Sequence, residues 1–306
     1  MRVLAVVGPT AVGKSALAVR LAKKYNGEII SCDSMQIYRG MDIGTAKITP
    51  EEAEGIPHHL IDILDPREQF SCADYAILAK KTVDDIISRG KTPIFCGGTG
   101  LYLDSVLEIS SFGTTYADEE YRCSLEIYAE ENGAEALHAM LKEIDPESAE
   151  AIHYNNVKRV IRALEIYKCA GKPKSVIDKE NKSLPSPYDS TVFFLSCESK
   201  ELLYSRIEKR VDIMMDKGLL DEARRLYDTG VFESSKTASA AIGYKELLPY
   251  LKGEADLDTC IDQLKLSTRH YAKRQLTWFK KKNYITVYTD KTDAFSEAVK
   301  ILGDTL

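Results

Sequence analysis

Short apolar runs alternate with amphipathic stretches along the first third of the chain. Val3–Val7, Gly27–Ser31 and Thr92–Cys96 are short, apolar-rich runs followed by polar or glycine-rich segments, a pattern typical of buried strands. Lys14–Tyr25 and Cys72–Arg89 carry apolar residues at helical spacing. This alternation of strand and helix predicts an α/β fold in which helices flank a mostly parallel sheet.

The loops that follow these strands are expected to carry the functional site. In open α/β sheets, ligands bind beyond the carboxyl ends of the strands. Three loops, at 8–15, 32–36 and 97–101, should therefore meet at one crevice.

The middle of the chain has a different pattern, with helical spacing of apolar residues and no clear strand. Its breaks lie at Asn132-Gly133, Asp145-Pro146 and Gly171. We predict a small all-helical insertion domain at 116–184, within an α/β core formed by 1–115 plus 185–306. The second part of this core is predicted to add two strands and four helices: Thr191–Ser196, Ile285–Tyr288, Lys200–Gly218, Leu219–Thr229, Tyr244–Leu251 and Leu257–Lys281.

A glycine-rich segment directly after the first strand matches a phosphate-binding motif. Residues 8–15 fit G-x-x-x-x-G-K-[ST], and a strand before them and a helix after them give the motif its usual context. The N–H groups of such a loop cradle an anion, Lys14 adds a positive charge, and the Ser15 hydroxyl can hold Mg²⁺. The fold is therefore expected to be P-loop NTPase-like. The residues expected to bind phosphate or diphosphate are Gly8, Pro9, Thr10, Ala11, Val12, Gly13, Lys14 and Ser15.

Composition narrows the class of protein. The chain has 306 residues, of which 44% are hydrophobic and 29% are charged, as in ordinary globular proteins. It has no apolar run near the roughly 20 residues that span a bilayer, and no signal-peptide layout at its start. Its seven cysteines are scattered without a C-x-x-C pair, which argues against a metal knuckle or a disulfide framework. We expect a cytoplasmic protein that does not bind a membrane.

Charge is distributed unevenly along the chain. The net charge is −6, yet the stretch 263–289 has seven basic residues and no acidic one, and 158–174 has six basic residues and one acidic one. Eleven acidic residues lie between 118 and 150. This asymmetry permits a local site for a polyanion on an acidic protein. The alternative is that these stretches are solvated helix faces.

Asp33 is the carboxylate closest to the expected crevice. Most P-loop ATPases hold Mg²⁺ through a strand that ends in Asp, but here the strand Thr92–Cys96 leads into Gly97-Gly98. Asp33 follows the strand at 27–31, where it can face a substrate, and a partly desolvated Asp can take a proton from an attacking amine. The alternative is an aspartate that only stabilises a turn.

Motifs from residue 8 to about 279 together resemble the tRNA dimethylallyltransferases, also called tRNA isopentenyltransferases. The matching blocks, in order, are 8–15, 33–47, 57–62, 97–102, 156–165, 241–246 and 268–279. This resemblance implies transfer of a dimethylallyl group from dimethylallyl diphosphate to N6 of the adenosine 3′-adjacent to the anticodon (position 37) of tRNA. The products would be N6-dimethylallyladenosine and diphosphate.

The resemblance also implies catalytic roles in the crevice. Asp33 would accept the N6 proton, and Thr99 would hydrogen-bond to the adenine or to the diphosphate. Lys14 and the backbone of 8–15 would stabilise the negative charge that grows on the diphosphate.

Arg210 is the fourth catalytic residue that the resemblance implies. It lies in an R-V-x-x-M pattern on a predicted helix and would reach the diphosphate. The alternative is a surface ion pair with a neighbouring acid, Glu208 or Asp212. The implied cofactor is Mg²⁺, held by Ser15 or by Thr10.

An adenine inside an anticodon loop must be extruded before its N6 can react. Gln36 has the donor and the acceptor needed to read a base edge, and basic residues on a helix and near the end of the chain would meet the RNA backbone. The candidate tRNA contacts are Asp33, Ser34, Met35, Gln36, Thr99, Tyr121, Lys158, Arg159, Val160, Ile161, Arg162, Lys273 and Arg274. Tyr271 would offer a stacking surface, whereas Trp278 is expected to pack into the core.

The implied partners are the tRNA anticodon loop and dimethylallyl diphosphate, bound by a monomer. Two other functions stay open from the residues alone. A small-molecule kinase built on the same loop would turn over ATP and would need a lid that carries arginines. An RNA-binding, GTPase-like module would need a base-specific motif such as N-K-x-D, which the chain lacks.

Overall fold

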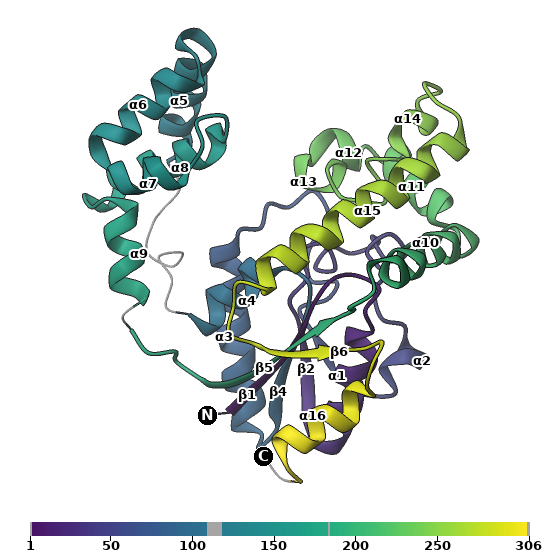
Figure 1. Ribbon diagram of the computed structural model, residues 1–306. Helices are drawn as coiled ribbons and strands as arrows, with labels where there is room; N and C mark the ends of the chain where they lie inside the picture. The colour runs from purple at the N-terminus through teal and green to yellow at the C-terminus, as the bar shows by residue number, and fades with distance from the viewer. Residues whose placement is uncertain (1, 109–117, 183, 305–306) are drawn as a thin grey trace. The chain divides into compact units, whose positions relative to one another are not determined.

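The computed structural model of the protein describes residues 2–108, 118–182 and 184–304. These residues form two compact units: those of 1–106 and 188–306 make up the first, and those of 107–187 make up the second (Figure 1). The predicted start of the insertion domain, residue 116, lies outside the described residues. No helix in these described ranges combines the length and the apolar character needed to cross a membrane.

A six-stranded parallel sheet forms the centre of the first unit. Its strand order is β3-β2-β4-β1-β5-β6. Val6 of β1 pairs with Cys96 of β4 on one side and with Phe193 of β5 on the other, so β1 is an interior strand. The predicted α/β class is confirmed. The strands are β1 (Arg2–Val7), β2 (Gly27–Ser31), β3 (His58–His59), β4 (Thr92–Gly97), β5 (Asp189–Ser196) and β6 (Ile285–Tyr288).

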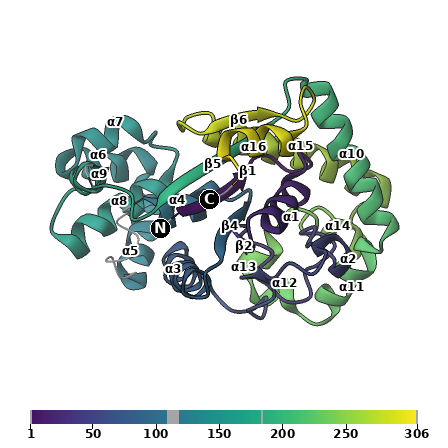
Figure 2. The same ribbon diagram turned by 90° about the horizontal axis from the view of Figure 1, so that it is seen from below.

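Helices cover both faces of this sheet. Figures 1 and 2 show α1 and α16 on one face and α3 on the other. The C-terminal half of α15 lies over the loops that follow β1 and β4. The helices here are α1 (Lys14–Lys24), α2 (Pro50–Ala53), α3 (Cys72–Ser88), α4 (Gly100–Leu107), α10 (Lys200–Asp216), α11 (Leu219–Asp228), α12 (Val231–Ser234), α13 (Lys236–Ser239), α14 (Leu248–Leu251), α15 (Leu257–Phe279) and α16 (Ala294–Leu302).

The predicted helix at 244–251 is wrong over its first half, because only Leu248–Leu251 is helical, as α14. Pro249 has no N–H to donate to the carbonyl four residues earlier, so a helix accommodates it only in its first turn. Tyr244 is fully buried instead, and its ring lies so close to Gly44 that any side chain there would overlap with it.

Alternate strand residues pack against α1. Leu4 and Val6 of β1 and Ile94 of β4 share a buried cluster with Leu17 and Leu21 of α1. The two helix residues are four positions apart and so lie on one face. Burial of each such side chain contributes roughly 1.5–3 kcal/mol. This packing holds the N-terminus of α1, and the loop before it, at the carboxyl end of the sheet.

The second unit is helical and has a core of its own. Its helices are α5 (Glu119–Asn132), α6 (Ala134–Ile144), α7 (Pro146–Ala151), α8 (Val157–Ala170) and α9 (Lys174–Lys182). The predicted breaks separate them: Gly133 lies between α5 and α6, Asp145 lies between α6 and α7, and Gly171 ends α8 in a left-handed conformation. Its core includes Leu125, Leu137, Leu141, Val160, Ile161, Ala163 and Leu164.

Candidate active site

The loop at 8–15 has a backbone suited to an anion. Gly8 has a φ of 150°, and a side chain there would overlap with the Leu195 carbonyl oxygen on β5. Ala11 (φ 64°) and Gly13 (φ 93°) are left-handed, a conformation that lets successive N–H groups converge on one point. Gly13 is the N-cap of α1, so the positive end of that helix faces the same point.

Hydrogen bonds join the loop after β2 to the loop after β4. The Cys32 N–H donates to the Cys96 carbonyl oxygen (2.9 Å), and the Thr99 N–H donates to the Cys32 carbonyl oxygen (3.0 Å). The Ser34 N–H donates to Thr99 Oγ1 (3.1 Å). A side chain at Gly97 would overlap with the Cys32 backbone, so this close approach requires glycine. These contacts keep Asp33, which lies between Cys32 and Ser34, in the loop next to Thr99.

A buried glutamine on α15 joins the phosphate loop to the loop after β4. Gln275 Oε1 accepts a hydrogen bond from the Thr10 N–H (2.9 Å), and Gln275 Nε2 donates to the Gly98 carbonyl oxygen (3.1 Å). All three predicted loops therefore meet at one place. Gln275 was not among the predicted site residues, although it lies in the matching block 268–279 and four residues after Tyr271 on the same helix.

Two cations and one carboxylate interact at this place. Burial lowers the pKa of Lys14 to about 8; nearby Arg210 lowers it as well, and Asp33 acts in the opposite direction. Burial also lowers the pKa of Arg210, again against the effect of Asp33. Lys14 Nζ donates to the Pro9 carbonyl oxygen (2.7 Å). Because both cations have lost much of their hydration, an anion in the loop would stabilise them strongly.

The acids offered as alternative partners for Arg210 pair with other residues. Glu208 pairs with Arg269, and Asp212 pairs with Lys265 (2.6 Å). Both of these cations belong to α15, so the two ion pairs cross the contact between α10 and α15. Arg210 itself interacts electrostatically with the residues of the phosphate-loop site. The ion pairs of Glu208 and Asp212 and this electrostatic coupling therefore favour the anion-binding interpretation over the surface pair.

Asp33 also stabilises a turn. Its Oδ1 accepts a hydrogen bond from the Met35 N–H (3.0 Å), as the alternative interpretation of this residue expects. That bond orients the carboxylate and does not use Oδ2. The turn contact and a role as base are therefore compatible in one side chain.

Tyr271 lies beside the catalytic candidates and is not a free stacking surface. Burial raises the pKa of its hydroxyl, Asp33 raises it as well, and a hydrogen bond with the Thr99 side chain acts against them. The Arg274 guanidinium lies 5.5 Å from the centre of the Tyr271 ring. Tyr271 and Gln275 share one face of α15, so that face contacts both Thr99 and the phosphate loop.

The prediction that Gln36 reads a base edge does not fit its contacts. Gln36 Nε2 donates to the carbonyl oxygens of Thr45 (3.2 Å) and Ala46 (3.4 Å), and Gln36 Oε1 accepts from Ser31 Oγ (3.0 Å). A side-chain amide has two N–H donors, and both are used here. Gln36 instead ties its loop to the turn at 42–46, which the buried Glu222 carboxylate holds through backbone N–H groups.

Part of the basic stretch at 263–289 is neutralised by acids of the first unit. Three of its cations form ion pairs: Lys265 with Asp212, Arg269 with Glu208, and Lys282 with Asp104. Lys273 and Arg274 are exposed. The interpretation as a polyanion site therefore applies to these exposed residues and not to the stretch as a whole.

The prediction that Trp278 packs into the core is wrong. The residue is 36% exposed, and its ring lies against Gly100, where a side chain would overlap with it. The Trp278 Nε1–H donates to Asp104 Oδ2 (3.2 Å). A large aromatic residue with a polar N–H is stable at such a half-exposed position because that donor is satisfied there.

In the helical unit, the structure contradicts two predicted tRNA contacts. Val160 and Ile161 are 0% and 4% exposed, and they pack in the core of the unit. Both side chains point into the core of the unit, so they cannot touch RNA in this conformation. Lys158 and Arg159, which directly precede them on α8, are exposed.

Arg162 and Tyr121 have partners within the helical unit. Arg162 pairs with Glu165, which is fully buried and also pairs with Arg122 (2.7 Å). The Lys168 ammonium group lies 4.1 Å from the centre of the half-buried Tyr121 ring. Contact with RNA through either residue would compete with these interactions.

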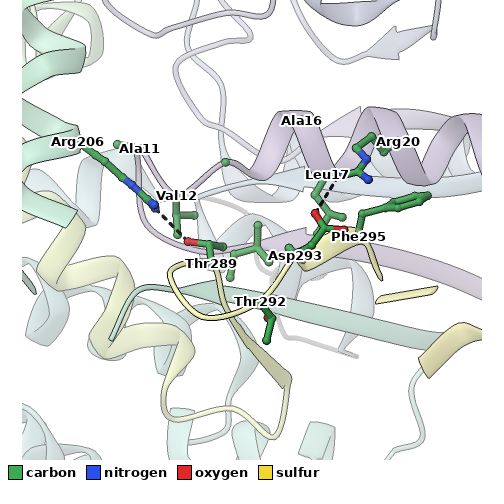
Figure 3. A pocket seen from close by; sticks show the side chains of 13 residues that line it. Ala11, Val12, Ala16, Leu17, Arg20, Arg206, Thr289, Thr292, Asp293 and Phe295 are labelled. Atoms are coloured by element: carbon green, nitrogen blue, oxygen red, sulfur yellow. Dashed lines mark hydrogen bonds and ion pairs between the residues drawn. The ribbon is translucent and has the colours of Figure 1, made fainter. Parts of the chain in front are cut away.

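The phosphate loop also borders a cavity of about 520 Å³, shown in Figure 3. Residues 11–13 form part of its wall, and the rest comes from α1, β5, α10, the connection between β6 and α16, and the first residues of α16. Within it, Arg206 donates to Thr289 (3.1 Å), and Arg20 pairs with Asp293 (3.1 Å). None of the four catalytic candidates lines this cavity, although Ala11, Val12 and Gly13 of the predicted diphosphate-binding loop do.

The phosphate loop suits a metal ion such as Mg²⁺ that takes most of its ligands from a bound substrate and from water. The Ser15 hydroxyl hydrogen-bonds the Cys96 thiol and can supply one oxygen ligand. The described part of the chain contains no group of three or more His, Cys, Asp and Glu side chains that could hold a metal ion. Mg²⁺ is commonly bound by one or two protein oxygens together with substrate phosphates and water. Ser15 fits that arrangement.

Comparison with known proteins agrees with this site. A family model described as IPP transferase matches residues 36–282. The chain belongs to the IPP transferase family. Among its relatives in this family, a tRNA dimethylallyltransferase from Halalkalibacterium halodurans is 51% identical over 292 residues, covering 95% of this chain and 92% of the relative. A protein of the same name from Acetivibrio thermocellus is 50% identical over 301 residues, covering 98% and 96%.

Solved structures in the IPP transferase family have the same fold. A tRNA isopentenylpyrophosphate transferase from Bacillus halodurans matches with a TM-score of 0.72 and 48% identity, covering 98% of this chain and 94% of that chain. A eukaryotic dimethylallyltransferase acting on tRNA matches with a TM-score of 0.86 and 32% identity, covering 99% and 79%. The resemblance inferred from the sequence motifs is confirmed.

Proposed function

We propose that this chain is a tRNA dimethylallyltransferase, which transfers a dimethylallyl group from dimethylallyl diphosphate to N6 of adenosine 37 in tRNA and releases diphosphate. One observation carries the chemistry: Lys14 and Arg210 are both desolvated by burial, and both interact electrostatically with Asp33 beside the glycine-rich loop. A single copy of the chain suffices, because all four catalytic candidates belong to the first unit. We place the enzyme in the cytoplasm, together with its tRNA substrate.

The phosphate loop would hold the leaving group. As the bond between the allylic carbon and the diphosphate oxygen breaks, its electron pair passes to that oxygen and negative charge grows on the diphosphate. The N–H groups of 8–15, Lys14 and Arg210 would stabilise this charge. A well-placed donor of this kind is worth roughly 3–4 kcal/mol in the transition state. Because the cations are already desolvated, little reorganisation is needed when the charge appears.

Asp33 would accept the proton that the acceptor loses. The N6 lone pair forms the new bond to the allylic carbon, and the N6 proton passes to Asp33. The Met35 N–H holds Oδ1 of this carboxylate, which leaves Oδ2 as the acceptor in this proposal. Thr99, whose hydrogen bonds hold it in the adjoining loop, would hydrogen-bond the adenine or the diphosphate.

Mg²⁺ would be held by Ser15, with Thr10 as a second candidate, together with diphosphate oxygens. When bound, it would neutralise part of the charge on the leaving group.

The exposed cations are the proposed tRNA contacts. Lys158 and Arg159 in the helical unit and Lys273 and Arg274 on α15 present positive charge to solvent, as phosphate-binding residues must. The half-buried segment 34–35 lies next to Asp33 and would face the extruded adenosine.

Prenyl transfer to unmodified tRNA tests the proposed function. Labelled dimethylallyl diphosphate, Mg²⁺ and the protein are incubated with the tRNA, which is then digested to nucleosides. We expect label in adenosine, a rate about 10²–10⁴-fold lower for Asp33→Ala, and a wild-type rate for the exposed control Asp258→Ala. Unlabelled adenosine together with ATP hydrolysis would instead support the kinase alternative.

A further inference from the structure

Gln275 connects the two ends of the proposed reaction. One of its hydrogen bonds goes to the phosphate loop, and the other goes to Gly98, the neighbour of Thr99. We propose that Gln275 is a positioning residue, which sets the distance between the diphosphate and the pair Asp33–Thr99. This inference rests on the proposed function, since it concerns the alignment of the same two substrates.

The orientation of the Gln275 amide follows from its partners. The Thr10 N–H can only donate and the Gly98 carbonyl oxygen can only accept, so Oε1 must face Thr10 and Nε2 must face Gly98. The residue is 5% exposed, and a side chain at Gly98 would overlap with Nε2. The amide therefore occupies a close-fitting space with a donor at one end and an acceptor at the other.

A short chain of contacts leads from this amide to the proposed base. Gly98 precedes Thr99, whose Oγ1 accepts from the Ser34 N–H (3.1 Å), and Ser34 follows Asp33. Tyr271, four residues before Gln275 on α15, hydrogen-bonds the Thr99 side chain. One face of α15 thus contacts the phosphate loop through Gln275. The same face contacts the loop after β4 through both Gln275 and Tyr271.

Loss of this alignment affects rate as well as folding. Removal of the Gln275 amide leaves the Thr10 N–H and the Gly98 carbonyl oxygen without this partner, and each of these two groups that stays buried then lowers the stability of the fold. Misplacement of reacting groups by about 1 Å can lower a rate about 100-fold. Loss of the Gln275 bonds should therefore lower kcat by much more than the loss of folded protein accounts for.

Gln275→Glu tests the role with nearly the same shape. One carboxylate oxygen can still accept from the Thr10 N–H, but the other faces the Gly98 carbonyl oxygen and repels it. At lower pH the carboxyl gains a proton and can donate to Gly98 again, and burial shifts this protonation toward higher pH. We expect kcat of this variant to be about 10–100-fold below wild type at pH 8, and the ratio of the two rates to approach one as the pH falls toward 5.

Two further variants complete the experiment. Gln263→Glu adds the same charge at an exposed position of α15 and should keep the wild-type kcat. Gln275→Leu removes both hydrogen bonds without adding charge, and it should lower kcat about 10–100-fold with no recovery at low pH. Steady-state prenyl transfer between pH 5 and pH 8, with melting temperatures in the same buffers, provides both readouts.

Several results would overturn the role of Gln275. A wild-type kcat in Gln275→Glu and Gln275→Leu would do so, as would a loss of activity that only matches the loss of folded protein. If the variant-to-wild-type ratio of Gln275→Glu did not change with pH, the assigned donor to Gly98 would be wrong. A wild-type protein that transfers no prenyl group would instead contradict the proposed function, and the positioning role with it.

Discussion

The low pKa of Lys14 predicts that the proposed diphosphate binding depends on pH. Burial lowers that pKa to about 8, so the free protein loses the charge on Lys14 as the pH rises through this value. A bound diphosphate would keep Lys14 protonated, because a nearby opposite charge favours the charged form. Above pH 8 the protein must therefore take up a proton when it binds diphosphate, and its affinity must fall.

The size of this effect follows from the pKa. With a pKa of about 8, Lys14 is charged in about nine-tenths of the free protein at pH 7 and in about one-tenth at pH 9. The affinity for diphosphate should accordingly decrease about tenfold over this range. Lys14→Met is the control, because any pH dependence that remains in this variant comes from the ligand or from other groups.

Calorimetric titration with inorganic diphosphate measures both quantities. Dissociation constants at pH 7 and pH 9 give the change in affinity, and buffers of different ionisation enthalpy give the number of protons taken up. We expect close to one proton at pH 9 and almost none at pH 7. Equal wild-type affinities at the two pH values, or the same proton uptake in Lys14→Met, would refute the assignment.

The same pKa shift has a consequence for stability. The unfolded chain has the ordinary lysine pKa of 10.5, so between pH 8 and pH 10.5 it binds more protons than the folded protein. The free energy of unfolding therefore rises with pH across this window, and the cost of the buried charge is fully present below pH 8. At pH 7, Lys14→Met should stabilise the ligand-free protein by on the order of 1 kcal/mol after the loss of the bond to Pro9. A lower melting temperature would contradict this.

Three further changes test other parts of the molecule. Arg210→Met should lower the prenyl-transfer rate about 10²–10³-fold, while the exposed control Lys209→Met keeps the wild-type rate; equal rates would remove Arg210 from the diphosphate site. Hydrogen bonds from Arg89 hold the pKa of buried Glu28 well below its ordinary value. The Glu28 carboxylate therefore contributes to stability at any pH above its ordinary pKa, and this contribution is lost as the pH falls toward the lowered pKa of the folded protein. Urea unfolding should show Glu28→Gln less stable than wild type at pH 7, with the gap narrowing in acid; a constant gap would be the contrary result. Ile161→Ala should cost about 2–4 kcal/mol of stability and leave tRNA affinity unchanged in filter binding, and weaker tRNA binding by the folded variant would restore Ile161 as a contact.

The elements around the phosphate loop were predictable because local sequence determines them. The apolar run of β1, the spacing of Leu17 and Leu21 in α1, and the glycines at 8 and 13 each satisfy a local requirement of geometry or burial. The same holds for the breaks in the helical unit, where Gly133 and Gly171 end helices. Motifs in a fixed order then identified the family.

The contacts that assemble the site could not be predicted, because they join distant parts of the chain. Gln275 and Thr10 are 265 residues apart, and no local pattern pairs them. The errors have a different cause. The motif groups Val160 and Ile161 with their basic neighbours and so predicts RNA contacts for all of them, although the helix turns these two side chains toward the core. Gln36 carries the groups to read a base, but the turn at 42–46 uses them.

A crystal structure with a non-reactive analogue of dimethylallyl diphosphate would decide where the donor binds. The diphosphate should lie in the loop at 8–15, within hydrogen-bond distance of Lys14 and Arg210, with its allylic end toward Asp33 and Thr99. An analogue bound elsewhere, with no diphosphate in that loop, would contradict the proposed reaction.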